Sequence, residues 1–473
     1  MQRLQKIGKI KQKHSSEIKT SKIGIGFEKL DRDVFDPEKA YDKVADIGVK
    51  WVRIQSGWAK TEKQKGVYNF SWLDNIVENL LSRGMKPWIC LCYGNGLYNE
   101  EAKQYFGAVG VPPIFTEEQK TAWANYVEAL VERYKGKVTH YEIWNEPDNP
   151  FCWKHGVNAH ELGVFTAETG KIIHRTDPSA TVIGLVQCEA NLKYMSDAFE
   201  GTEMAENIDA LSFHEYVVSE TSVPERVESM RAIADHYRKG IKIIQGESGS
   251  QSRAGGNGAL ADKLWTEKAQ MKQLARHLMI DLSVGVEFSS YFSCLDMIEA
   301  LQGTVDNKAS YLDYGYFGVL RAEFDENGFS IGSYSEKPSY YALQTMASVF
   351  AEEIEVKNAP VLFRPEYFDG YNTFDCSRNQ VVSAYFERPD GEQCFVYWNP
   401  TNILTTDYCG SVSFQFITKH EDLKLVDLCT GDVYALPDDM FKKENLCAYL
   451  SHLPIKDYPL ALVTEAFCNF DKE

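Results

Sequence analysis

Two stretches of the sequence decide the fold. Residues 141–147 read YEIWNEP, and residues 243–249 read IIQGESG. Each begins as a short apolar run of the kind that forms a buried strand, and each reaches a glutamate, Glu146 or Glu247, where that run ends. We therefore expect two strands of one sheet, each carrying a carboxyl group at its end.

Outward from these two runs, the chain alternates short strand-like segments with longer helical patterns. Such alternation is typical of repeated βα units on a parallel sheet. The eight expected strands are Ile23–Phe27, Trp51–Gln55, Lys86–Cys92, Val138–Trp144, Thr181–Gln187, Ala210–His214, Ile241–Gln245 and Val286–Phe292. Eight such units predict an α/β fold, a closed (β/α)8 TIM barrel.

After about Glu352 the apolar residues follow a different spacing. Segments 381–387, 393–398, 411–417 and 424–428 alternate apolar and polar residues, and a short apolar run follows at 460–463. This pattern predicts a C-terminal all-β sandwich domain. We divide the chain into an N-terminal extension at 1–21, a catalytic barrel at 22–351 and the β-sandwich at 352–473. The extension either adds a strand to the sandwich or is disordered.

The composition narrows the possible partners. The 473 residues include 50 Lys and Arg against 68 Asp and Glu, a net charge of −18, which disfavours nucleic acid and anionic membrane surfaces. A neutral polar substrate fits this charge better. No apolar run is long enough to span a bilayer. The first twenty residues lack the apolar core of a secretory signal. We expect a cytoplasmic protein, or a periplasmic or secreted one if a signal peptide has been removed, in an oligomeric state that the sequence leaves open.

The two glutamates are the strongest functional signal. Strands four and seven of a closed barrel face each other across its axis, and the loops that follow the strands converge on the active site. Glu146 and Glu247 are therefore expected in one cleft, although either alone could be an ion-pair or helix-cap residue. Glycoside hydrolysis needs such a pair: one carboxyl group protonates the leaving oxygen, and the other attacks or activates water.

Four motifs add a family resemblance: GVKWVR at 48–53, WNEPD at 144–148, SFHEY at 212–216 and KPSYYAL at 337–343. With them the chain resembles the clan of retaining (β/α)8-barrel glycosidases, and within it most resembles glycoside hydrolase family 39, the β-xylosidase and α-L-iduronidase family. The resemblance implies a double displacement on β-glycosidic bonds of an oligo- or polysaccharide. Glu146 would be the acid/base and Glu247 the nucleophile, with no metal or organic cofactor.

The resemblance also implies supporting residues around this pair. Asn145 would hydrogen-bond the sugar hydroxyl next to the anomeric carbon, and Arg53 would hold the nucleophile ionised. A structural partnership of Arg53 with Glu142 is the alternative, and both can hold together. His214 and Tyr216 would orient the nucleophile or contact sugar, although His214 could instead be a core histidine.

Aromatic residues supply the candidates for sugar contact. We expect Trp153, Trp58 and Tyr93 to bind substrate, with core packing as the alternative for the tryptophans. Many clan members place a tryptophan at the end of strand eight, and here Tyr291 or Phe292 is expected to replace it. Three basic residues lie just beyond the catalytic strands: Lys154, His155 and Arg253. They could bind the carboxylate of a uronic acid, or they could be solvated charges.

A long insertion at 295–336 separates strand eight from its helix. Insertions at this end of a barrel lie beside the active site, so we expect it to close the cleft and make the enzyme exo-acting and xylosidase-like. The aromatic residues Tyr311, Tyr314, Tyr316 and Phe317 would stack on sugar or pack against neighbouring loops. The alternatives are an endo-acting hydrolase of the same clan, a catalytically inactive carbohydrate-binding protein, and transglycosylation in place of hydrolysis.

Overall fold

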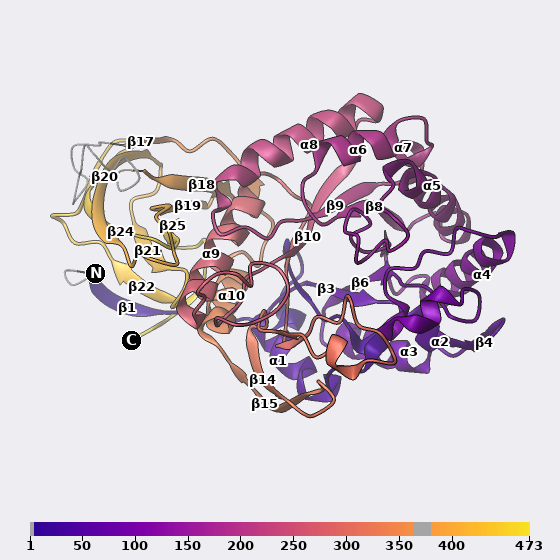
Figure 1. The fold of residues 1–473 in the computed structure, drawn as a ribbon. Coiled ribbons are helices and arrows are strands. Elements are labelled where there is room, and N and C mark those ends of the chain that lie inside the picture. The colour runs from indigo at the N-terminus through magenta and orange to yellow at the C-terminus, as the bar shows by residue number, and fades with distance from the viewer. Residues whose placement is uncertain (1–3, 364–379) are drawn as a thin grey trace.

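Parallel strands close into a barrel at the centre of the larger part of the molecule (Figure 1). The structure is a computed structural model that describes residues 4–363 and 380–473. Within the first of these ranges, eight strands pair in the closed order β10–β11–β2–β3–β6–β7–β8–β9. Their bounds are β2 Ile23–Gly26, β3 Trp51–Gln55, β6 Lys86–Leu91, β7 His140–Ile143, β8 Thr181–Gln187, β9 Ala210–His214, β10 Lys242–Ser248 and β11 Ser289–Tyr291. The predicted TIM barrel is confirmed.

Helices cover the outside of the barrel because each presents an apolar stripe to the strands. In α3 (Ser71–Ser82) the buried residues are Leu73, Ile76, Val77 and Leu80, which are spaced to share one helix face. The other large helices are α1 Tyr41–Ile47, α4 Glu117–Tyr134, α5 Ala159–Thr176, α6 Leu192–Phe199, α8 Val223–Tyr237, α9 Glu267–Ser283 and α10 Pro338–Val349. No helix in the described parts of the chain is long and apolar enough to cross a membrane.

Strand β10 differs from its predicted form at the end that carries Glu247. The sequence predicts that this strand stops at Gln245, but it continues through Gly246 to Ser248. Its pairing with β9 shifts register there, so that Glu247 lies opposite His214. A Cβ atom on Gly246 would lie 2.3 Å from the Ser212 hydroxyl oxygen, so glycine is needed for this close approach.

The C-terminal part of the chain forms two antiparallel sheets, as predicted. The larger has the order β16–β18–β19–β25–β21–β22–β1–β26, and the smaller has the order β17–β20–β24–β23. The larger sheet comprises β16 Glu355–Val356, β18 Val382–Glu387, β19 Gln393–Trp398, β25 Leu460–Thr464, β21 Leu423–Asp427, β22 Asp432–Ala435, β1 Gln5–Ile10 and β26 Phe470–Lys472. The smaller comprises β17 Val361–Phe363, β20 Cys409–Ile417, β24 Cys447–Lys456 and β23 Phe441–Glu444.

The start of the chain belongs to the larger C-terminal sheet. Strand β1 pairs antiparallel with β22 on one side and with β26 on the other. The two ends of the chain therefore lie on the same side of the molecule (Figure 1). Of the two possibilities left open for the N-terminal extension, the structure shows the added strand.

The larger sheet is buried on both faces. Along β19, Phe395 and Tyr397 belong to the core between the two sheets, whereas Val396 and Trp398 join the core of the barrel. This division follows from the alternation of side chains along a strand. The sheet therefore connects the two cores, and β19 reads as a nearly continuous apolar run.

The insertion at 295–336 folds into two small hairpins. Strands β12 (Met297–Ile298) and β13 (Tyr314–Gly315) form one, and β14 (Leu320–Phe324) and β15 (Ser330–Glu336) form the other. The ring of Tyr311 stacks on Phe106 with centroids 4.4 Å apart. The insertion is therefore anchored to the loop that follows β6.

Buried ion pairs fasten α9 to the C-terminal sheets. Lys272 Nζ lies 2.5 Å from a carboxylate oxygen of Asp457, and both side chains are 2% exposed. Arg276 pairs with Glu220 at 2.8 Å and donates to the carbonyl oxygen of Thr401. A buried ion pair adds little stability compared with well-packed apolar side chains in the same place. Removing one partner is nevertheless destabilising, because it leaves the other charge buried without a counter-ion.

We expect Lys272→Ala to lower the free energy of unfolding by about 3–5 kcal/mol, because Asp457 would lose its buried cation. Urea unfolding, followed by tryptophan fluorescence, measures this change. Lys268→Ala is the matched control on the same helix, because Lys268 meets Asp407 in a pair that is 59% and 65% exposed. Equal urea midpoints for the two variants would contradict the prediction that the buried Lys272–Asp457 pair matters more for stability than the exposed Lys268–Asp407 pair.

Candidate active site

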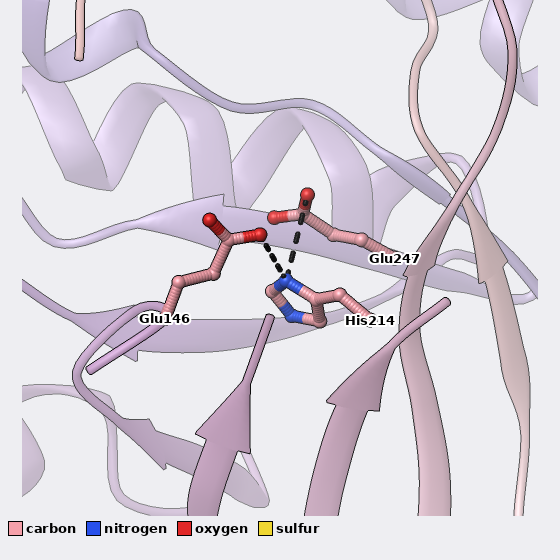
Figure 2. Close-up of side chains that lie close together, drawn as sticks. All are labelled: Glu146, His214 and Glu247. Carbon is pink, nitrogen blue, oxygen red and sulfur yellow. Dashed lines mark hydrogen bonds and ion pairs between the residues drawn. The ribbon is translucent and has the colours of Figure 1, made fainter. Parts of the chain in front are cut away.

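The carboxyl ends of the barrel strands surround a cavity of about 690 Å³. Glu146, just after β7, and Glu247, in β10, both line it, together with Asn145 and Tyr216. Figure 2 shows the two glutamates converging on the ring of His214. The structure therefore brings into one cavity the two carboxyl groups that the sequence places far apart.

The backbone that carries Glu146 is held in a conformation that side-chain-bearing residues rarely adopt. Trp144 has a φ of 68° and Glu146 a φ of 46°, both in the left-handed region. The Trp144 indole donates to the carbonyl oxygen of Cys152 at 2.8 Å, and the Glu146 backbone N–H donates to that of Val186 at 3.0 Å. These bonds hold the strained turn, a feature that is concentrated at functional sites.

His214 lies between the two carboxyl groups. Its Nδ1 atom is 2.9 Å from Oε1 of Glu146 and 3.7 Å from Oε2 of Glu247. One oxygen of each glutamate and this nitrogen all lie within 4.8 Å of one another. Burial alone would lower the pKa of His214, but the charge of Glu247 and the contact with Glu146 raise it above 6.5.

Glu247 is surrounded by groups that favour its ionised form. The Tyr216 hydroxyl donates to Oε2 at 2.7 Å, and Arg53 donates to Oε1. Burial acts to raise the pKa of Glu247, but His214, Arg53 and the Tyr216 hydroxyl together bring it below its ordinary value. Glu247 is therefore a carboxylate in neutral solution.

Arg53 connects the floor of the barrel to the cavity. This fully buried side chain donates from Nε to Glu142 at 2.6 Å and from Nη2 to the Asn145 amide oxygen at 2.8 Å. Nη1 donates to Glu247. Arg53 thus contacts both of the partners expected for it, Glu142 and Glu247.

Two tryptophans predicted to contact sugar lie in the core instead. Trp153 and Trp58 are 0% and 1% exposed and do not line the cavity. Trp153 packs edge-on against Trp144, and Trp58 stacks on Tyr98 and Tyr126. The structure corrects the prediction for both, because a tryptophan gains most by burying its large apolar area.

Aromatic contact at the cavity comes from other residues. Tyr93 lines the cavity as predicted, but Tyr291 does not. The Tyr291 hydroxyl lies against the carbonyl oxygen of Ser250, and its neighbour Phe292 lines the cavity because successive residues of an extended chain face opposite sides. Phe317 from the insertion packs edge-on against Phe292 and also lines the cavity.

The three basic residues considered for a uronic acid do not line the cavity. Lys154 donates to the carbonyl oxygens of Phe151 and Leu301, and His155 pairs with Glu161. Arg253 lies over the ring of Tyr316. All three side chains are engaged elsewhere.

Sequence reasoning missed several residues of the cavity wall. These include Glu28, Lys29, Arg32, Gln55, Cys188, Glu189, Glu299 and Asp313. Glu28, Gln55 and Glu189 follow or end barrel strands, so the rule that found Glu146 could have found them. Glu299 and Asp313 lie in the insertion, whose path no periodicity reveals.

The cluster of Glu146, His214 and Glu247 also has a spacing that a metal ion could bridge. Oxygen atoms of the two glutamates already contact His214, Tyr216 and Arg53. A second cation beside the Arg53 guanidinium would be repelled. The arrangement is therefore better suited to proton transfer and nucleophilic attack than to metal binding.

The barrel presents two carboxyl groups from its fourth and seventh strands in one cavity, which is the arrangement that glycoside hydrolysis requires. Comparison with known families agrees: the family described as Glycosyl hydrolases family 39 matches residues 33–244. This range includes Glu146 and His214 and stops just before Glu247. The resemblance seen in the sequence motifs is confirmed over these residues.

Individual relatives are distant. The β-galactosidase BgaA of Clostridium cellulovorans is 28% identical over 149 residues, which cover 28% of this chain and 22% of that protein. A β-xylosidase of Geobacillus stearothermophilus is 24% identical over 163 residues, which cover 33% of this chain and 32% of that protein. The matched regions thus span under a third of either relative.

Solved structures show the same fold over most of the chain. A family 39 glycoside hydrolase from Bacteroides cellulosilyticus WH2 superposes with a TM-score of 0.64 at 17% identity, covering 95% of this chain and 82% of that one. At this identity the likeness establishes the architecture, a barrel followed by antiparallel sheets.

We expect Tyr216→Phe to move the acid limb of kcat/KM upward by about one pH unit. As the expected nucleophile, Glu247 must be ionised, and loss of the Tyr216 hydroxyl raises its pKa, so activity should be lost at a higher pH as the solution is acidified. The measurement is a pH profile on an aryl glycoside. Tyr93→Phe is the control, because its hydroxyl faces the Cys152 sulfur, 3.9 Å away; a limb that moves equally in both variants would contradict the prediction.

Proposed function

We propose that the chain is a retaining glycoside hydrolase that cleaves β-glycosidic bonds by double displacement. The observation that carries this proposal is the close approach of Glu146 and Glu247, whose nearest oxygens share a 4.8 Å cluster with His214. Retaining enzymes need carboxyl groups about 5–5.5 Å apart, whereas inverting enzymes need about 6.5–9.5 Å to admit a water molecule. The spacing favours direct attack by a carboxylate.

In the first step, an oxygen of Glu247 attacks the anomeric carbon while the bond from that carbon to the leaving oxygen breaks. Glu146 gives its proton to the leaving oxygen, and a glycosyl ester of Glu247 remains. In the second step, Glu146 takes a proton from water, whose oxygen attacks the anomeric carbon and releases Glu247. Arg53 and Tyr216 hold the attacking carboxylate, and His214 orients both glutamates.

The charges of the cavity favour a neutral sugar over a uronic acid. Six carboxyl-bearing residues line it: Glu28, Glu146, Glu189, Glu247, Glu299 and Asp313. The lining cations are Lys29 and Arg32, and both are already paired, with Glu299 and Asp31. The names of the two curated relatives, a β-galactosidase and a β-xylosidase, point to neutral sugars as well.

The insertion supports exo action. It contributes Glu299, Leu301, Gln302, Ser310, Asp313 and Phe317 to the cavity wall. A wall on this side shortens the cleft, so we assign a xylosidase-like enzyme that removes terminal sugars. An endo-acting hydrolase with the same carboxyl pair is the second candidate, and the products distinguish the two.

We expect Glu247→Ala to lower kcat/KM by about 10⁴-fold or more on every aryl glycoside, because no other group can form the glycosyl ester. Glu146→Ala should lower kcat/KM far less on a dinitrophenyl glycoside, because its leaving group needs little protonation. Azide should then restore turnover and yield a β-glycosyl azide, detected by NMR. Glu287→Ala, at the opposite end of the barrel and paired with Lys242, is the control and should keep wild-type rates. Near wild-type activity of Glu247→Ala would refute the role assignment.

Digestion of xylo- or galacto-oligosaccharides should release single sugars, or one fixed short unit, from the start. Shortening the tip of the insertion at residues 304–311 should weaken binding of the terminal sugar and permit internal cleavage. Chromatography of early time points measures both effects. Mixed-length products from the intact enzyme would favour the endo-acting candidate.

A further inference from the structure

Glu28 is a buried carboxyl group of the cavity wall that the mechanism above does not use. It follows β2, and its side chain is 2% exposed. Its Oε1 atom lies 3.2 Å from Nη1 of Arg53, the nitrogen that also donates to Glu247. Among the described residues this oxygen has no partner with hydrogen-bond geometry. Buried polar groups rarely lack a hydrogen bond, so a carboxyl group in the cavity wall with one such oxygen points to a ligand group as its further partner.

The surroundings of Glu28 determine its chemical form. The groups that face it are Lys29 from its own loop, Arg53 from β3, Tyr216 after β9, Glu247 from β10 and Cys294 after β11. Burial and the charge of Glu247 raise the pKa of Glu28 to about 8, against the opposing effect of the two cations. At neutral pH it is therefore mainly a carboxylic acid, which offers both an O–H donor and a carbonyl acceptor.

We propose that Glu28 is a third functional carboxyl group of this site, which hydrogen-bonds a hydroxyl group of the bound sugar and so helps to set sugar specificity. The proposal deepens the proposed function and rests on it. A sugar hydroxyl is both a donor and an acceptor, so it can pair with the carboxylic acid group that Glu28 contributes to the cavity wall. The competing role is purely structural, in which Glu28 only supports Arg53 and through it Glu247.

Deoxygenated substrates separate these roles. The probes are 4-nitrophenyl β-D-xyloside and β-D-galactoside, and the 2-, 3- and 4-deoxy analogues of whichever is hydrolysed faster. Glu28→Ala should lower kcat/KM on the parent glycoside about three- to tenfold, the effect of one hydrogen bond. The loss should vanish on the one analogue that lacks the contacted hydroxyl. Glu28→Gln, which keeps a donor and an acceptor, should stay within about threefold of the wild type.

Glu142→Gln is the matched control for the structural role. Glu142 binds Arg53 at 2.6 Å but does not line the cavity. Its replacement should shift the acid limb of the pH profile and lower activity equally on all the analogues. If Glu28→Ala also lowers kcat/KM by the same factor on every analogue, Glu28 acts through Arg53 alone and the proposal is wrong.

Measurements of sugar binding test the role of Glu28 independently of hydrolysis. Isothermal titration of xylose and galactose into the full chain should show weaker binding by Glu28→Ala than by Glu28→Gln at pH 6. Wild-type affinity should fall as the pH rises through about 8, and that of Glu28→Gln should not. Failure of the wild type to hydrolyse either glycoside, with this binding pattern intact, would overturn the proposed function alone. Equal binding by all variants, or no binding by the wild type, would overturn the role of Glu28.

Discussion

The buried guanidinium of Arg53 is the interaction on which the site depends. It contacts Glu142 inside the barrel, and Asn145, Glu247 and Glu28 toward the cavity. Burying a charged side chain costs free energy unless its hydrogen-bond donors find acceptors. Arg53 is fully buried, and three of its nitrogens lie beside oxygen acceptors. The same contacts that make the cation tolerable also fix the positions of Glu247 and of Asn145, the neighbour of Glu146. Packing of the barrel interior and alignment of the carboxyl groups are thus one constraint.

A second constraint comes from the C-terminal sheets. The larger sheet closes its own core with the smaller sheet on one face and packs against the barrel on the other. Trp398 illustrates the link, because its indole donates to Glu220 at 2.8 Å while Glu220 also pairs with Arg276 of α9. Along the chain α9 follows the strand that carries Glu247, and its Gln270 and Glu267 bind Phe317 and Arg321 of the insertion. The sheets therefore support the helix that follows the strand carrying Glu247.

The sequence predicts the barrel well because each strand is a short apolar run and each helix has its own periodicity. Strands Trp51–Gln55, Thr181–Gln187 and Ala210–His214 have the predicted bounds. It locates Glu146 and Glu247 because strand ends converge in any such barrel. It misplaces Trp58 and Trp153 because composition cannot tell a core tryptophan from an exposed one. Glu299 depends on the path of the insertion, which is fixed by contacts such as Tyr311 on Phe106 rather than by local pattern.

The carboxyl groups around the cavity divide into ionised and neutral forms, and this division has a cost in stability. Burial is the main cause that raises the pKa of Glu28 to about 8 and that of Glu299 to about 7, from an ordinary value of 4.5. Between pH 4.5 and these values the folded chain holds protons that the unfolded chain has released. These groups therefore lower the free energy of unfolding as the pH rises through this range.

Glu247 contributes in the opposite sense. Its pKa is lowered on folding despite its burial, so it adds stability above its ordinary value that is lost as the pH falls below it. The two effects are coupled, because each neighbour that stays protonated spares Glu247 the repulsion of another negative charge. The site thus keeps one carboxylate reactive by keeping nearby carboxyl groups neutral, at the expense of stability near neutral pH.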